Sequence, residues 1–377
     1  MKKIYLDNNA TTPLDPRVIE ALQETLVPFP FNPSSSHAFG QEAKQLLTKS
    51  RDTIAHALHL KPQQLIFTSG GTEALNFLLR GFYSLAPGCH ILTSNVEHPA
   101  VYETLQSLPG ARITDLPAGL WGAIQPHQIE EAITPETRLI TLTAANNITG
   151  VETDIAAIAA LADKRGIPFV VDGVQVLGKK PLRIPPGVSG MAFSAHKLHG
   201  PTGIGLAALL TRDPVPPLIT GGSQEHGKRA GTPNIIGIVG FAKAAALLST
   251  ELPAATEKMK NLRDHLTHGL MQALGNIVVH GQGPRLCNTA HIGFPGVDGE
   301  TLLMQLDLAG IAVSHGSACT SGGLEPSPIL LKMGIPNSLA RSSLRFSLSR
   351  FTTLEDIDTT IDTISHLIKK PYNLPRE

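Results

Sequence analysis

The residues around Lys197 have the types and spacing that covalent amine chemistry requires. Ser194 and His196 precede this lysine, a Gly-Pro pair soon follows it, and Asp172 ends an apolar run farther upstream. A lysine amine reacts when its charge is suppressed and its surroundings are fixed. A pyridoxal phosphate enzyme uses such a lysine to hold the cofactor's aldehyde as a Schiff base, and such an acid to keep the pyridine nitrogen protonated. The competing interpretation is a solvated lysine on a turn.

A phosphate-binding turn is predicted at Gly71 and Thr72, between an apolar run, 65–68, and a helical pattern that reaches about Arg80. Glycines allow the backbone to approach a phosphate, and the start of a helix supplies free N–H groups. The competing interpretation is an ordinary helix cap with Glu73 in the first turn. The segment lacks the glycine spacing of the common nucleotide-binding motifs, so a nucleotide site is less supported.

Three further polar residues follow predicted strands. Gln175 could donate to the phenolic oxygen of a pyridoxal ring, and His98 could stack on the ring and move protons near neutral pH. Asn147 could bind either a ring hydroxyl or a substrate carboxylate. Taken alone, His98 could equally cap the next helix, Asp172 and Gln175 could be a solvated pair, and Asn147 could be a turn residue.

Two candidate residues lie near the C-terminus. Cys319 is part of a Gly- and Ser-rich loop, 314–325, where an exposed thiol could act as a nucleophile. Arg345 is on a short predicted strand, 343–347, and an arginine can grip a carboxylate with two hydrogen bonds. The alternatives are a buried thiol and a surface arginine. Cys89 and Cys287 lack such surroundings, so structural roles are expected for them.

The pattern of elements predicts an α/β fold with a mainly parallel sheet flanked by helices, because strands and helices alternate through the first two thirds of the chain. The predicted strands are 65–68, 90–93, 138–142 and 168–172. Ligands of such sheets bind at the carboxyl ends of strands, where these polar residues lie. After about residue 250, a helix at 254–274 and short strands predict a smaller α+β domain. We therefore expect a large domain of residues 16–250 and a small domain of 1–15 and 251–377.

Composition limits the classes of partner. Lys plus Arg and Asp plus Glu each number 31 in the 377 residues, so the net charge is zero and neither nucleic acid nor an anionic membrane is the expected partner. No signal peptide is evident, and the stretch 235–248 is too short for a membrane span and contains Lys243. Three cysteines without a CxxC pair suit a reducing cytoplasm. No metal site is predicted.

Eight motifs in the same order give the chain a resemblance to the NifS/IscS-type cysteine desulfurases, in the class V aminotransferase family of fold type I pyridoxal phosphate enzymes. They are Tyr5-Leu6-Asp7-Asn8-Asn9-Ala10-Thr11-Thr12, Asn32-Pro33-Ser34-Ser35, Ser69-Gly70-Gly71-Thr72-Glu73-Ala74, Glu97-His98-Pro99-Ala100, Asn146-Asn147, Ser194-Ala195-His196-Lys197, Arg229-Ala230-Gly231-Thr232 and Gly316-Ser317-Ala318-Cys319. Each motif alone would be weak, and the ordered set spans nearly the whole chain.

The resemblance implies a role for each candidate residue. Lys197 is expected to carry the cofactor, Asp172 and Gln175 to hold the ring nitrogen and oxygen, and His98 to stack and move protons. Asn147 and Arg345 are expected to bind the substrate carboxylate, and Cys319 to accept sulfur. The implied phosphate ligands are Gly71, Thr72, Ser194, His196 and, from a second subunit, Thr232. The last residue implies a homodimer with shared sites.

The implied reaction releases alanine from L-cysteine and leaves a persulfide on Cys319 for a sulfur-acceptor protein, in iron–sulfur cluster assembly or thiolation. A selenocysteine lyase and a cofactor-free scaffold that docks sulfur carriers remain as alternatives. The chain departs from the family's usual pattern at Ile148, Gly173 and Ser349. None of these changes removes a chemical group that the mechanism needs.

Overall fold

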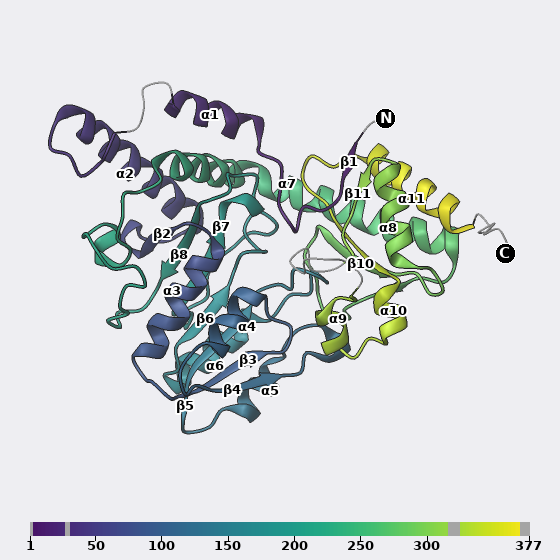
Figure 1. Cartoon of the computed structure of the whole chain (residues 1–377), viewed down its shortest axis with the longest axis horizontal. Helices are drawn as coiled ribbons and strands as arrows, with labels where there is room; N and C mark the ends of the chain where they lie inside the picture. Colours follow the sequence, from purple (N-terminus) through teal and green to yellow (C-terminus); the bar gives the residue numbers. More distant parts are fainter. Residues whose placement is uncertain (1–2, 27–30, 316–324, 370–377) are drawn as a thin grey trace.

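The computed structural model describes residues 3–26, 31–315 and 325–369, and a seven-stranded sheet forms the centre of its larger part (Figure 1). Along the sheet the order is β2-β8-β7-β6-β5-β3-β4. All neighbours are parallel except β8, which is antiparallel to β2 and to β7. The strands are β2 (Leu65–Thr68), β3 (His90–Ser94), β4 (Arg112–Leu116), β5 (Thr137–Thr143), β6 (Phe169–Asp172), β7 (Gly190–Ser194) and β8 (Gly205–Leu209). The predicted α/β architecture with a mainly parallel sheet is confirmed.

Helices cover both faces of this sheet, which explains why its central strands are apolar throughout. On β6, Phe169 and Val171 belong to one buried cluster and Val170 to another, because successive side chains of a strand point to opposite faces. The first cluster packs under α2 (Ala38–Leu58), α6 (Ile155–Arg165) and α7 (Ile235–Leu274). The second packs under α3 (Gly71–Ser84) and α4 (Pro99–Gln106).

The smaller part combines two short sheets with two helices. Strands β12 (Ser343–Ser347), β10 (Thr289–Gly293) and β9 (Val278–Val279) form an antiparallel sheet. Near the chain start, β1 (Ile4–Tyr5) pairs in parallel with β11 (Ile311–Ala312). Helices α8 (Gly299–Leu308) and α11 (Leu354–Lys369) join these strands in a third hydrophobic cluster. The shorter helices of the chain are α5 (Pro126–Ala132), α9 (Pro328–Lys332) and α10 (Asn337–Arg341).

The predicted helix 254–274 starts too late. It is the second half of α7, which begins at Ile235, spans 40 residues and contains Pro253. Packing against α1 (Pro16–Leu26), α2 and α11 stabilises the helix along its length, so the proline does not end it. Figure 1 shows α7 extending from the larger to the smaller part. The expected domain boundary at residue 250 therefore falls inside one continuous helix.

Helix α7 is also long and apolar enough to cross a membrane by length and composition alone. However, 56% of its most apolar window is buried inside the protein, as in the core helix of a globular domain. The length and composition of α7 are therefore only weak evidence for a membrane span.

Candidate active site

The predicted site residues meet in one cavity of about 570 Å³ at the carboxyl edge of the large sheet. Of the predicted residues, Gly71, Thr72, His98, Asn147, Asp172, Gln175, Ser194, His196, Lys197 and Arg345 line it. Thr232 does not: it is exposed on the loop before α7. Cys319 lies outside the described residues. The carboxyl edge of the sheet therefore brings most of the predicted residues together in one cavity.

Lys197 closes a short 3-10 turn, Ala195–Lys197, directly after β7. Its Nζ donates hydrogen bonds to the backbone carbonyls of Asn9 and Ala10, both at 2.6 Å. The N-terminal segment therefore crosses to the large sheet and holds the amine at the cavity wall. The polar run Asn8-Asn9-Ala10-Thr11-Thr12 is the one local signal for this contact, and it does not indicate Lys197 as the partner.

Asp172 ends β6 with its carboxylate buried beside the cavity. The Val174 amide donates to Oδ1 at 3.0 Å. Burial raises the pKa of Asp172, while His98, the Val174 amide and Lys197 oppose that rise. A buried carboxylate is stabilised by a cationic partner, and a protonated pyridine nitrogen is such a partner.

His98 both caps a helix and lines the cavity. Its Nδ1 accepts a hydrogen bond from the Ala100 amide at 3.0 Å, at the start of α4. Burial lowers the pKa of His98 most; Asp172 opposes this shift and Lys197 adds to it. A neutral imidazole whose Nδ1 accepts carries its proton on Nε2. The two interpretations of this histidine are therefore compatible, and its Nε2–H is the proton that it can give.

The start of α3 provides a place for a phosphate. Gly71 opens the helix, and a Cβ at this position would lie 2.7 Å from Val174 Cγ2. Ser194 and His196 line the same cavity, and His196 Nδ1 lies 3.1 Å from Thr11 Oγ1. Burial, followed by the positive charges of Lys197 and Lys179, lowers the pKa of His196 to about 4. This histidine is therefore neutral at pH 7.

The guanidinium of Arg345 lines the cavity and is held by two contacts. Its side chain is buried on β12, where Nη1 donates to the Asn147 carbonyl at 3.0 Å. Its Nη2 donates to Asp7 Oδ1 at 2.6 Å. Sequence reasoning found Arg345 but missed Asp7, although the acid stands in the N-terminal motif. The ion pair orients the guanidinium before any ligand arrives.

Glu97 is a buried acid next to His98. Ser94 Oγ and the Thr143 amide donate to its Oε1 at 2.5 and 3.1 Å. Burial is the main cause that raises the pKa of Glu97 to about 8, with smaller contributions from Asp172 and Asp115. Glu97 is therefore largely protonated at neutral pH, and it links the ends of β3 and β5.

We expect Glu97→Gln to flatten the pH dependence of stability. Because the folded pKa exceeds the unfolded one, the stability from the Glu97 proton is complete below about pH 4.5 and is lost as pH rises to about 8. The loss amounts to roughly 5 kcal/mol at alkaline pH. Urea unfolding of the apoprotein at pH 5 and pH 9 measures it. The same pH dependence in variant and wild type would show that Glu97 is not a buried neutral acid.

The three departures from the family pattern have local explanations. A Cβ at Gly173 would lie 2.4 Å from Met191 Cε and 2.8 Å from Phe193 Cε1, so these large neighbours leave no space for a side chain. Ile148 is fully buried and lines the cavity. The Ser349 hydroxyl accepts a hydrogen bond from the Phe351 amide at 3.2 Å. Of the three, only Ile148 lines the cavity, and it presents an apolar side chain there.

The side chains fit pyridoxal 5′-phosphate. An amine, a buried carboxylate, an imidazole and a helix start with nearby hydroxyl and imidazole groups match its aldehyde, ring nitrogen, ring face and phosphate. In the described part of the chain, no three His, Cys, Asp or Glu residues are grouped as a metal site.

Comparison with known proteins agrees with this geometry. Residues 4–360 match the aminotransferase class V family. Cysteine desulfurase IscS of Dictyoglomus turgidum is 39% identical over 98% of this chain and 95% of its own length. A solved NifS-like protein superposes with a TM-score of 0.90 at 33% identity, covering 97% of this chain and 99% of its own. The solved structure "SspA in complex with cysteine" has a TM-score of 0.81 at 28% identity and covers 93% of this chain and all of its own.

The chain therefore belongs to the class V aminotransferase family of fold type I pyridoxal phosphate enzymes. Within that family it is a cysteine desulfurase, and its cofactor is pyridoxal 5′-phosphate.

Proposed function

We propose that the 570 Å³ cavity is where L-cysteine loses its sulfur, with Lys197 carrying the cofactor and Cys319 accepting the sulfur as a persulfide. One observation supports this most: Lys197, Asp172, His98 and Arg345 come from distant parts of the chain and line the same cavity. A sulfur-accepting thiol is the remaining requirement, and Cys319 supplies it in the sequence.

The bound cofactor supplies an electron sink for the substrate's α-carbon. Asp172 keeps the ring nitrogen protonated, and Gln175 donates to the ring oxygen. Once the substrate's amino group has replaced it, Lys197 Nζ takes the α-proton. His98 lines the cavity, and its Nε2–H is the proton that it can give.

Arg345 and Asn147 hold the substrate carboxylate. The guanidinium is held by Asp7 and by the Asn147 carbonyl, so it meets a carboxylate without first rearranging. The Asn147 amide can add a hydrogen bond from the same wall. Fixing the carboxylate at this end sets the direction in which the substrate's sulfur points.

The sulfur step is a displacement by the Cys319 thiolate. It attacks the substrate's sulfur, an S–S bond forms, and the C–S bond breaks with its electron pair left on the substrate carbon. Protonation of that carbon and return of the α-proton give alanine, and the sulfur remains as a persulfide. The described residues on both sides of the segment that contains Cys319 lie near the cavity, which supports its role as sulfur acceptor. Ser314 pairs with Arg345 through two backbone hydrogen bonds, and Pro328 lines the cavity.

The proposal also covers the oligomeric state, the sulfur acceptor, the compartment and the domain limits. A homodimer explains why Thr232 lies exposed outside the cavity of its own chain, because it can then bind the phosphate in the partner's cavity. The persulfide passes to a sulfur-acceptor protein, either an iron–sulfur scaffold or a thiolation enzyme. Cys89 and Cys287 are free and buried, which suits the reducing cytoplasm. The domain limits 16–250, and 1–15 with 251–377, also stay a prediction.

The experiment for this proposal is Asp172→Asn, assayed by alanine formation from L-cysteine. We expect the variant to bind the cofactor but to lose roughly a hundred-fold or more in kcat, because a neutral amide no longer keeps the ring nitrogen protonated. Asp154→Asn, at the exposed N-cap of α6, is the matched control and should keep wild-type activity. A wild-type kcat for Asp172→Asn would exclude its assigned role.

A further inference from the structure

Lys179 is a buried lysine to which the proposed mechanism gives no part. Only 4% of its surface is exposed, and Nζ donates to Gln175 Oε1 at 2.9 Å. The backbone carbonyl of Lys179 accepts hydrogen bonds from Cys287 Sγ at 3.0 Å and from Thr256 Oγ1 at 3.3 Å. Both the backbone and the side chain of this lysine are therefore held in place.

The contacts of Gln175 require one orientation of its amide. Lys179 Nζ carries N–H groups in either protonation state and donates to Oε1, so the amide atom that faces it is the oxygen. On the other side, Nε2 donates to the Asn9 carbonyl at 3.2 Å, and a carbonyl can only accept. The Asn9 carbonyl also accepts from Lys197 Nζ, so the amide nitrogen lies on the reactive side of the cavity.

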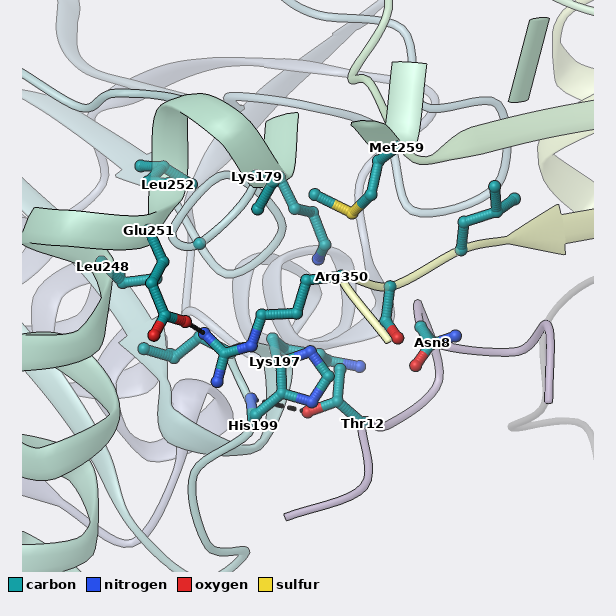
Figure 2. Close-up of a pocket in the computed structure, with 15 residues that line it drawn as sticks. Asn8, Thr12, Lys179, Lys197, His199, Leu248, Glu251, Leu252, Met259 and Arg350 are labelled. Carbon is teal, nitrogen blue, oxygen red and sulfur yellow. Dashed lines mark hydrogen bonds and ion pairs between the residues drawn. The ribbon is translucent and has the colours of Figure 1, made fainter. Parts of the chain in front are cut away.

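Lys179 borders a second, much smaller cavity of about 20 Å³ behind Lys197, shown in Figure 2. The charged groups on that side are already matched: Glu251 pairs with Arg17 and Arg350. His199 also lines the cavity and is kept neutral by burial, which lowers its pKa to about 4. Within the described part of the chain, no carboxylate forms an ion pair with Lys179.

The surroundings of Lys179 are therefore costly for a charge. Burial is the main cause that lowers the pKa of Lys179 to about 7; repulsion from Lys197 and Arg345 adds to it, and Cys287 opposes it. A methionine of similar size would remove this cost, so stability alone does not explain a lysine here. Its contact with Gln175 is the contact through which it reaches the cavity.

We propose that Lys179 is a positioning residue that holds the Gln175 amide with Nε2, and not Oε1, toward the phenolic oxygen of the cofactor. The inference rests on the proposed site. The amide nitrogen carries two hydrogens, one for the Asn9 carbonyl and one for the ring oxygen. A reversed amide would set its oxygen against an ionised ring oxygen, and the two acceptors would repel each other.

The test is a pH titration of the visible absorption of the cofactor-loaded enzyme. In Lys179→Met, the midpoint should move up by about one pH unit, because the cofactor holds its proton more tightly without a donor at the ring oxygen. The cofactor's dissociation constant should also rise. Lys179→Arg keeps a donor, and the adjacent small cavity offers it room, so it should keep the wild-type midpoint. Lys180→Met, next to it on the surface and paired with Glu152, should also titrate like wild type.

A double-variant cycle shows whether Lys179 acts by positioning the Gln175 amide or by its own charge. In a Gln175→Ala background, Lys179→Met should move the midpoint no further, because Lys179 acts through the amide. An equal shift with and without Gln175 would overturn the proposal, as would an unchanged midpoint in Lys179→Met. If Lys179→Met does not fold, a Lys179→Arg midpoint shifted by a full pH unit would also overturn it. Failure of the proposed site looks different, since the wild-type enzyme would then show no visible band with the cofactor.

Discussion

Replacing Lys197 by alanine should abolish covalent attachment of the cofactor and lower kcat by roughly four orders of magnitude. The same amine both holds the cofactor and removes the α-proton, so its loss affects two steps. The hydrogen bonds from Nζ to Asn9 and Ala10 are lost as well, and with them the fixed position of the N-terminal segment. Alanine formation and the visible spectrum measure the two effects separately.

The control for this variant is Lys180→Ala, which removes a half-exposed lysine that pairs with Glu152. It should keep both the cofactor band and the activity. A Lys197→Ala enzyme that still carries covalently bound cofactor, or that turns over cysteine near the wild-type rate, would rule out the assignment of this lysine.

Replacing Cys319 by serine should abolish the reaction without loss of the cofactor. The variant keeps the coloured cofactor, because the residues that bind it are unchanged, but it no longer releases alanine from L-cysteine. A hydroxyl cannot accept sulfur as a persulfide, so the C–S bond is not broken. Spectra and alanine formation, measured on the same preparation, test this prediction.

Cys89→Ser is the matched control, because Cys89 is buried away from the cavity and free of any disulfide. It should keep the activity. Normal turnover of cysteine by Cys319→Ser would remove Cys319 from the mechanism. Rates on selenocysteine are a useful second measurement, since selenium leaves with less help from a protein thiol. A variant that loses only its cysteine reaction would point to selenocysteine lyase chemistry in the same site.

The local sequence predicted three of the strands that place polar residues at the cavity. Gly71, His98 and Asp172 follow or end predicted apolar runs, so the position of a strand determines the position of its polar residue. Strand β7, which precedes Lys197, was not predicted. The parallel sheet then brings these strand ends to one edge. Prediction failed at Ile235, the start of α7, because Pro253 is a local breaking signal and the packing that overrides it comes from distant helices.

The contacts that orient the reactive groups could not be predicted from the sequence. Asp7 holds Arg345, the Asn9 carbonyl holds Lys197, and Lys179 holds Gln175. The first two pairs join the chain start to residues far along the sequence, and only the tertiary fold sets such contacts. Lys179 lies close to Gln175 in sequence, but its burial is visible only in the packed structure.

The most direct test of the central claim is to find which lysine carries the cofactor. The wild-type enzyme is loaded with pyridoxal 5′-phosphate, reduced with borohydride, digested and analysed by mass spectrometry. Our account predicts that the modified peptide contains Lys197. A modification found on Lys179, on Lys332, which also lines the 570 Å³ cavity, or on any other lysine would contradict it.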